Sequence, residues 1–381
     1  MTRETQDTTI FPNTLLVAVE APYNKTKDIN SYFEEFKNLA KSNGIETEHF
    51  MPMKLREIDS ATFLTSGKVE QITEYCKKHD IEMVILSEPL TTKQERNLRE
   101  IWDVRDVVDR TKLILEIFQR AATSAEGKMQ VEIAILQVLK SKVAGRGVEL
   151  SQQAGFIGAR GPGETLKEKE MRYLDTQIDT LKAKLEKLLK VRATQRKQRL
   201  VNKIPQICLV GYTNAGKSTI LNTLTKAGVL AEDKLFATLD TTTRELYINH
   251  QKKGVISDTV GFIQMLPTKL IEAFKSTLSE LQHADLLLHV VDIADQNWDS
   301  QIKVVNYILE DLEVDAQMLY VFNKADKIEI TYQLQEMMNR FQPNVTISAL
   351  TKDGIKPLID FIETWQPDLQ VRLKKEQEEQ D

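Results

Sequence analysis

The chain has 381 residues, 41% of them hydrophobic. At about 100 to 200 residues per domain, this length predicts two or three folded domains and excludes a single small module. The net charge of −5, from 51 basic against 56 acidic side chains, excludes a uniformly basic coat for nucleic acid. Two cysteines, Cys76 and Cys208, are too few for a disulfide scaffold or a thiolate metal cluster, so we expect a reducing compartment.

Charge and hydropathy vary along the chain. Residues 140–203 carry 16 basic and 7 acidic side chains, a net +9, whereas residues 204–366 carry 14 and 21, a net −7. Segment 1–11 is polar, and no apolar run approaches the ~20 residues that a membrane helix requires. We therefore expect a soluble, cytoplasmic protein without membrane insertion, whose positive charge is concentrated in one middle segment.

The first part of the chain alternates short apolar runs with helical patterns. Residues 14–19 and 83–86 are predicted to be strands, and residues 32–40 and 93–101 to be helices. Such alternation is typical of a small α/β domain with a mainly parallel sheet. We assign this domain to residues 1–110.

Two long helices are predicted next, within residues 111–203. Apolar side chains recur in both at spacings of three and four, which is the pattern of a helix with one apolar stripe. Residues 191–203 are then expected to form a basic linker. The first stripe comprises Leu115, Phe118, Ala122, Ala125, Met129, Ile133 and Leu136, and the second comprises Met171, Leu174, Ile178, Leu181, Leu185 and Leu188.

A glycine-rich stretch, residues 144–165, separates the two stripes and holds six of the chain's 15 glycines. Because glycine disfavours a helix, we expect a mobile loop here. Two striped helices joined by a loop can bury their stripes against each other as an antiparallel hairpin, with the loop at an exposed tip. An ordinary helical subdomain with a disordered connector is the alternative.

Residues 204–366 return to an alternation of strands and helices. Buried strands are predicted at 207–210, 254–257, 286–291, 318–322 and 345–347. This pattern is typical of a doubly wound α/β domain. A charged tail, residues 367–381, follows it. The expected fold class is therefore α/β, with a helical hairpin between two α/β domains.

Residues 211–218, with the sequence GYTNAGKS, follow an apolar strand and precede a helical pattern, as a phosphate-binding loop requires. The glycines let backbone N–H groups turn toward phosphate oxygens, Lys217 neutralises the β and γ phosphates, and the Ser218 hydroxyl ligates Mg²⁺. We expect nucleotide to contact Gly211, Tyr212, Thr213, Asn214, Ala215, Gly216, Lys217, Ser218 and Thr219.

Three further motifs stand at the ends of later strands. In the DTVG string, a carboxylate reaches Mg²⁺ through water and a glycine N–H meets the γ-phosphate. The NKAD string supplies acceptors for the N1 and N2 hydrogens of guanine, and the SAL string supplies a backbone N–H for guanine O6. Four motifs in this order predict GTP as the ligand. The residues are Asp258, Thr259, Val260 and Gly261; Asn323, Lys324 and Asp326; and Ser348, Ala349 and Leu350.

A polar loop with several hydroxyl groups lies between the first two motifs. We choose Thr238 as the switch threonine that completes Mg²⁺ coordination when a γ-phosphate is present, and Thr241 or Thr242 is the alternative. The nucleotide-contacting residues expected in this loop are Phe236, Ala237, Thr238, Leu239 and Asp240.

Two positions bear on hydrolysis. Phe262 follows Gly261 where many small GTPases have a glutamine that orients the attacking water, so intrinsic hydrolysis is expected to be slow. Asn214 either helps to hold a monovalent cation, K⁺, where an arginine finger would act, or makes a simple loop hydrogen bond. We expect Lys217, Thr238 and Gly261 to carry catalysis, with Mg²⁺ on Ser218 and Thr238.

The four motifs, the strings FATLD and DTVGF, the stretch GFIGARGPGET and the upstream segment DRTKLILEIFQRAATSAEGKMQVEIA together resemble the HflX family of ribosome-associated GTPases. The resemblance covers most of the chain from about Gly67 onward. It implies an amino-terminal HflX domain, a helical hairpin and a GTPase domain that binds the large ribosomal subunit. It also implies splitting or rescue of stalled ribosomes and GTP hydrolysis stimulated by that subunit.

The charge pattern agrees with such a partner, because ribosomal RNA presents dense phosphate. We expect a monomer that binds the large subunit and not DNA. The alternatives are a GTPase acting in ribosome assembly or RNA modification, and an RNA-binding scaffold whose nucleotide is only structural. The expected RNA contacts are Lys140, Lys142, Arg146, Arg160, Arg192, Arg196, Lys197 and Arg199.

Overall fold

The structure is a computed structural model, and it describes residues 12–24, 26, 28–153, 166–225, 235–236, 238–267, 270, 274, 278 and 280–367. The chain forms two compact units. The first unit comprises Met1–Ile117 and Ile135–Thr176, and the second comprises Phe118–Ala134 and Gln177–Asp381. Within the described residues, no helix is both long enough and apolar enough to cross a membrane.

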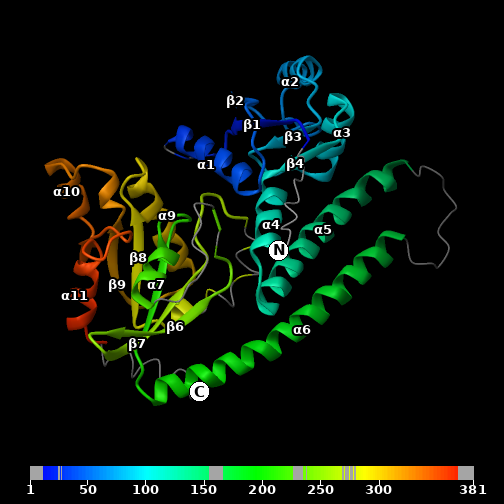
Figure 1. Cartoon of the computed structure of the whole chain (residues 1–381). Coiled ribbons are helices and arrows are strands. Elements are labelled where there is room, and N and C mark those ends of the chain that lie inside the picture. Colours follow the sequence, from blue (N-terminus) through cyan, green and yellow to red (C-terminus); the bar gives the residue numbers. More distant parts are fainter. Residues whose placement is uncertain are drawn as a thin grey trace, which may run out of the picture. The chain divides into compact units, whose positions relative to one another are not determined.

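The first unit contains a four-stranded, wholly parallel sheet in the order β2-β1-β3-β4. Strand β1 is buried along almost its entire length, as expected for a strand covered on both faces. This arrangement confirms the expected α/β fold here (Figure 1). The strands are β1 (Thr14–Glu20), β2 (Phe50–Lys54), β3 (Met83–Leu86) and β4 (Asp106–Asp109), and the helices between them are α1 (Ile29–Ser42), α2 (Ser66–Lys78) and α3 (Thr92–Trp102).

Local signals fix where two helices of this unit, α1 and α3, begin. The Asp28 side chain accepts hydrogen bonds from the first free N–H groups of α1, and Thr91 forms a capping box with Gln94 at the start of α3. Behind α1, Glu35 forms an ion pair with Arg110 at 2.5 Å, and both side chains are buried.

The helical segment differs from the sequence expectation at three places. The stripe from Leu115 to Leu136 belongs to two helices, α4 (Arg110–Ala121) and α5 (Ala125–Gln153), instead of one. The chain breaks at Ser124 because its hydroxyl accepts a hydrogen bond from the Gly127 N–H, which starts a new helix. An apolar stripe shows only which face of a helix is buried. The spacing of three and four therefore continues across the break between the two helices.

Helix α5 also continues to Gln153, past Gly145 and Gly147, where a loop was expected. A single glycine costs a helix only about 0.5–1 kcal/mol, which the surrounding helix formers offset. Helix α6 (Leu166–Val201) likewise includes most of the expected basic linker, because residues 191–201 contain no glycine or proline to end it. The remaining glycine-rich residues, 154–165, lie outside the described residues.

The two long helices pair in antiparallel fashion within the first unit. Lys140 of α5 forms an ion pair with Asp175 of α6, and the Lys167 ammonium donates to the Ala144 carbonyl at 2.9 Å. Partners further along α5 thus meet partners earlier on α6, as the predicted hairpin requires.

The second unit contains a six-stranded sheet in the order β10-β9-β8-β5-β7-β6. Neighbouring strands are parallel except at one edge, where β6 runs antiparallel to β7. The order reverses between β5 and β8, and loops at the carboxyl ends of strands near such a reversal form the ligand crevice of α/β sheets. The strands are β5 (Gln206–Gly211), β6 (Thr242–Ile248), β7 (Gln251–Asp258), β8 (Leu286–Asp292), β9 (Gln317–Asn323) and β10 (Asn344–Thr346).

Strand β6 was not expected, because Thr242, its first residue, was considered as a switch threonine of the polar loop. Its outer residues are largely exposed, so it has the weak apolar pattern of an edge strand. The helices that accompany the sheet are α7 (Lys217–Thr225), α9 (Trp298–Asp311), α10 (Tyr332–Met338) and α11 (Lys356–Thr364), with a short 3₁₀ turn, η1 (Ala325–Lys327).

Candidate functional site

The loop between β5 and α7 turns sharply through three residues with positive φ. These are Gly211 at +145°, Asn214 at +62° and Gly216 at +99°. A Cβ atom on Gly211 would lie 2.2 Å from the Val290 carbonyl oxygen, and one on Gly216 would lie 2.2 Å from the Asn323 amide. The loop therefore needs glycine at both places to pass this close to its neighbours.

Lys217 opens α7 and is buried inside this loop. Its ammonium group donates to the Tyr212 carbonyl at 2.7 Å and to the Gly211 carbonyl at 3.2 Å. Burial lowers the pKa of Lys217 to about 8, although the Asp258 carboxylate acts in the opposite direction. A desolvated cation held by two carbonyls is a site prepared for an anion such as phosphate.

Three oxygen-bearing side chains converge next to Lys217. The Ser218 hydroxyl lies 2.7 Å from the Thr238 hydroxyl and donates to one Asp258 carboxylate oxygen at 2.6 Å. Burial raises the pKa of Asp258, opposed by Lys217 and Ser218. The other Asp258 oxygen, Oδ1, is buried and has no hydrogen-bond partner among the described residues. This set of hard oxygen donors, one of them an orphaned carboxylate oxygen, fits Mg²⁺.

Two of the candidate switch threonines, Thr238 and Thr242, lie in different settings. The Thr238 hydroxyl lies 2.7 Å from the Ser218 hydroxyl, whereas Thr242 opens strand β6 and is paired with Asp258 in the sheet register. The Thr238 hydroxyl is therefore in direct contact with the serine of the phosphate loop.

The phosphate loop is joined to the residues that follow β7. The Thr213 N–H donates to the Phe262 carbonyl at 2.8 Å, and the Phe262 N–H donates to the Gly211 carbonyl at 3.1 Å. A Cβ on Gly261 would lie 2.8 Å from the Thr213 Cα and 2.9 Å from the Lys217 ammonium. The Phe262 side chain is 2% exposed and belongs to the core.

Asn323 links the phosphate loop to the loop after β10. Its amide donates to the Ala215 carbonyl at 2.9 Å, and its side-chain oxygen accepts from the Ala349 N–H at 3.1 Å. Nearby, the Ser348 hydroxyl donates to the Asp326 carboxylate at 2.5 Å. The NKAD and SAL motifs therefore meet in space, although 22 or more residues separate them in sequence.

The remaining predicted residues lie in several settings. Val260 and Leu239 are buried, and the Thr259 hydroxyl donates to the Leu209 carbonyl. The Leu350 side chain is 73% exposed, and Thr219 lies on α7. Ala237 lies outside the described residues.

Two residues of the switch loop turn toward the middle segment of the chain. Phe236 packs edge-to-face on Phe118 with ring centroids 4.6 Å apart, and Asp240 accepts hydrogen bonds from Thr123 and Ser124. Sequence reasoning did not single out Thr123 and Ser124 as functional residues. Both lie in the segment DRTKLILEIFQRAATSAEGKMQVEIA quoted above, and serine is a typical helix cap.

Sequence reasoning also missed Asp292, which ends β8 and forms an ion pair with Lys324 at 2.7 Å. An acidic residue directly after a buried strand is a detectable signal. The pair fixes the Lys324 side chain within the NKAD motif.

The basic middle segment is partly engaged in internal ion pairs. Lys140 pairs with Asp175 and Lys142 pairs with Glu95. Arg160 lies outside the described residues. Arg146, Arg192, Arg196, Lys197 and Arg199 lie within helices α5 and α6.

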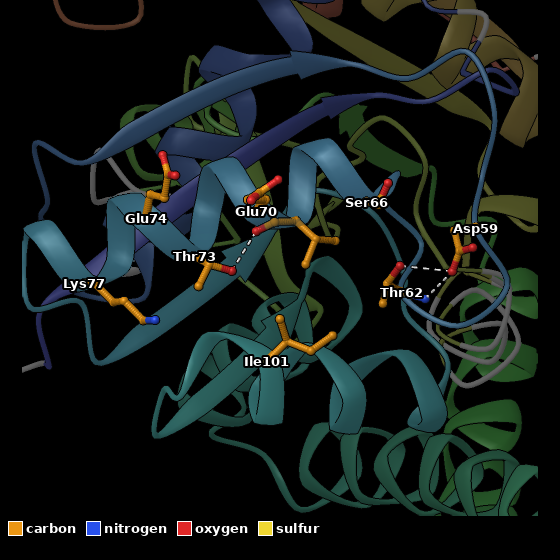
Figure 2. A pocket seen from close by; sticks show the side chains of 9 residues that line it. Asp59, Thr62, Ser66, Glu70, Thr73, Glu74, Lys77 and Ile101 are labelled. Atoms are coloured by element: carbon orange, nitrogen blue, oxygen red, sulfur yellow. Dashed lines mark hydrogen bonds between the residues drawn. The ribbon is translucent and has the colours of Figure 1, made fainter.

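A separate cavity of about 560 Å³ opens in the first unit between α2 and α3 (Figure 2). The Asp59 carboxylate stabilises the turn that it begins, because it accepts hydrogen bonds from the N–H groups of Ala61 and Thr62. The Thr73 hydroxyl donates to the Val69 carbonyl. None of the nucleotide motifs contributes to the lining. The lining residues are Asp59, Thr62, Ser66, Val69, Glu70, Thr73, Glu74, Lys77 and Ile101.

Three family models match successive parts of the chain. They are described as GTP-binding GTPase N-terminal, over residues 30–119; GTP-binding GTPase Middle Region, over residues 121–199; and 50S ribosome-binding GTPase, over residues 206–324. The last range contains the phosphate loop, the switch loop and the strand-end motifs through Lys324.

Curated relatives are similar over almost the whole chain. GTPase HflX of Caldanaerobacter subterraneus is 42% identical over 92% of this chain and 79% of its own length. GTPase HflX of Escherichia coli K12 is 39% identical over 91% of this chain and 81% of its own length. The crystal structure of the SsGBP and GDP complex matches with a TM-score of 0.51 at 25% identity, covering 96% of this chain and 99% of that chain. The chain therefore belongs to the HflX family of GTPases and hydrolyses GTP.

Proposed function

We propose that this GTPase is a nucleotide-gated factor that binds the large ribosomal subunit and splits or rescues stalled ribosomes. The observation that carries the proposal is the match of residues 206–324 to the model described as 50S ribosome-binding GTPase. The net charge of +9 over residues 140–203 supports it, because a cationic segment is suited to ribosomal RNA. The protein acts as a monomer in the cytoplasm and does not bind DNA.

The proposed division of labour in the site follows from its contacts. Lys217 neutralises the β and γ phosphates, and the backbone N–H of Gly261 meets the γ-phosphate. Ser218 and Thr238 hold Mg²⁺, with Asp258 behind Ser218. Bound Mg²⁺ supplies charge neutralisation for the phosphates.

The base is bound at the other end of the site. Asp326, positioned by Ser348, accepts the N1 and N2 hydrogens of guanine, and the loop after β10 supplies an N–H for O6. Asn214, which has a positive φ in the phosphate loop, either helps to hold K⁺ or makes a simple loop hydrogen bond. Asn323 keeps the phosphate end and the base end in register.

Hydrolysis by the free protein is proposed to be slow. Phe262 is apolar, and its ring is buried in the core, so it cannot orient the attacking water. The ribosome therefore supplies the missing positioning. GTP favours the form that binds the large subunit, because the γ-phosphate orders the segments around Thr238 and Gly261.

Titration of purified large subunits into a GTPase assay tests the proposal. The steady-state rate is expected to rise with large subunits and to stay near its basal value with small subunits. A rate that large subunits leave unchanged would remove the ribosome from the mechanism. In parallel, full-length protein should sediment with large subunits in the presence of a non-hydrolysable GTP analogue and should be released by GDP.

The same sedimentation experiment separates the second candidate, a GTPase of ribosome assembly or RNA modification. Precursor large particles and mature subunits are compared at equal concentration. Preference for mature subunits and complete ribosomes supports splitting or rescue, whereas preference for precursors supports assembly.

The proposed domains, 1–110, 111–203, 204–366 and the tail 367–381, are tested by limited proteolysis.

A further inference from the structure

The loop that carries Thr238 is fastened to the start of helix α5 by one carboxylate. Asp240 Oδ2 accepts from the Thr123 N–H at 2.8 Å, the Thr123 hydroxyl at 2.6 Å and the Ser124 N–H at 2.7 Å. The other oxygen, Oδ1, accepts from the Ser124 hydroxyl at 2.5 Å. All of these residues belong to the second compact unit. We call this four-bond contact the Asp240 latch.

The start of α5 is shaped to receive this carboxylate. The Ser124 hydroxyl also accepts from the Gly127 N–H at 2.9 Å, so one side chain caps the helix and holds Asp240. The positive end of the helix dipole favours an anion at this place. Three of the four hydrogen bonds reach Oδ2 and one reaches Oδ1, and donors placed on both oxygens favour the charged carboxylate in the latch.

Gly127 makes room for the latch. A Cβ atom at this position would lie 2.1 Å from Asp240 Oδ1, well inside contact distance. Glycine is otherwise the poorer choice in a helix, by about 0.5–1 kcal/mol relative to alanine. The close approach of Asp240 gives a physical reason for glycine in the first turn of α5.

The other end of the loop is held by aromatic packing on the preceding helix, α4. The Phe118 ring makes edge-to-face contacts with Phe236 at 4.6 Å and with Phe274 at 5.1 Å between centroids. Thr238 therefore lies between two anchors, Phe236 and Asp240, which both rest on residues 118–124. Between these anchors its hydroxyl points to Ser218.

We propose that Asp240 is a positioning residue for GTP hydrolysis, because the latch holds Thr238 at the Ser218 hydroxyl. The proposal rests on the role assigned above to Thr238. The middle segment of the chain thereby becomes part of the nucleotide switch. Because coupling between two equilibria is reciprocal, GTP that fixes Thr238 also strengthens the contact of Asp240 with α5, and GDP does not.

Two variants of the full-length protein break the latch from opposite sides. Asp240→Asn keeps the shape of the side chain but loses its charge and two acceptor sites. Gly127→Ala displaces Asp240, whereas alanine itself favours the helix. Weaker binding of the GTP analogue by this variant therefore cannot be assigned to poor folding of α5. The affinity for a non-hydrolysable GTP analogue is measured against the affinity for GDP, together with kcat.

Both variants are expected to bind the GTP analogue more weakly by roughly 5- to 150-fold, the usual range of coupling between sites, with GDP affinity little changed. Ser124→Ala should likewise weaken binding of the GTP analogue. Ser124→Thr, which keeps the hydroxyl, should bind it like the wild type. Asp28→Asn is the matched control, because Asp28 also caps a helix, α1, but in the first unit.

The position of Thr238 is tested alongside. If Thr238→Ala weakens binding of the GTP analogue but Asp240→Asn and Gly127→Ala behave as the wild type, the latch proposal alone is overturned. If Thr238→Ala has no effect either, the role assigned to Thr238 falls, and the latch falls with it.

Discussion

The side-chain amide of Asn323 donates a hydrogen bond to the Ala215 carbonyl, 2.9 Å away, across 108 residues of sequence. The same side chain accepts from the Ala349 N–H, and it is 2% exposed. One buried amide thus holds together the phosphate loop at the end of β5 and the loop after β10. These are the two loops proposed above to contact the phosphates and the base of GTP.

Asn323→Ala is expected to destabilise the protein and to weaken guanine-nucleotide binding. It leaves the Ala215 carbonyl and the Ala349 N–H without partners, and each buried unsatisfied group costs about 1–3 kcal/mol. Urea unfolding and calorimetric titration with GDP measure the two effects. Asn97→Ala, which removes a single hydrogen bond in the first unit, should leave GDP affinity unchanged. An Asn323→Ala protein with wild-type affinity would contradict the linking role.

Gly261→Ala is expected to weaken the binding of a GTP analogue. Its Cβ would meet the backbone of Thr213 at 2.8 Å and the Lys217 ammonium at 2.9 Å, so the phosphate loop must shift. Gly67→Ala is the matched control, because no atom lies within 4 Å of the added Cβ on α2. The control should keep its affinity and its melting temperature, and equal affinities in the two variants would show that the close approach at Gly261 is unimportant.

Nucleotide binding is expected to take up a proton above pH 8. Burial lowers the pKa of Lys217 to about 8, so at pH 8.5 most of the free protein holds a neutral amine there. A phosphate beside the amine raises its pKa, which means that a proton is bound together with the nucleotide. The affinity for GDP should therefore decline as pH rises from 8 to 9.

Calorimetry in buffers of different ionisation enthalpy counts these protons. Uptake should be clear at pH 8.5 and vanish at pH 6.5, where Lys217 is already protonated in the free protein. The same small uptake at both pH values would show that the lysine is charged throughout.

Glu35→Gln is expected to destabilise the protein, by up to about 3–5 kcal/mol, because it removes the carboxylate that lies 2.5 Å from the buried Arg110 guanidinium. Glu34→Gln is the control, because Glu34 is the neighbour of Glu35 on α1. It breaks the ion pair between Glu34 and Lys37, whose side chains are 64% and 39% exposed, respectively. Exposed pairs contribute about 0–1 kcal/mol, so this control should barely change the free energy of unfolding. Equal effects of the two substitutions in urea unfolding would refute the argument from burial.

Much of the GTPase site was predictable because its chemistry is local in sequence. A strand, a glycine turn and Lys217 stand within a dozen residues, and each later motif begins at or just after the end of a strand. Strand ends of a parallel sheet meet at one edge, so their order alone predicted that the motifs converge. The strand boundaries at 286–291 and 318–322 were likewise close to those of β8 and β9.

The helical segment was less predictable from its pattern. An apolar stripe continues through the break at residues 122–124, and glycine content suggested a loop where α5 in fact continues to Gln153. Periodicity reports which side of a helix is buried but carries no signal for a short interruption. The capping of α5 by Ser124 was the available clue.

The ligand class, the order of the motifs and the α/β fold were predictable from the amino-acid sequence, since these depend on residue types at short spacing. The contact of Thr238 with Ser218, the burial of Phe262 in the core and the binding of Asp240 to α5 became known from the folded structure alone. Those contacts join residues up to 117 positions apart, and their geometry exists only after both partners are packed against the same sheet and helices.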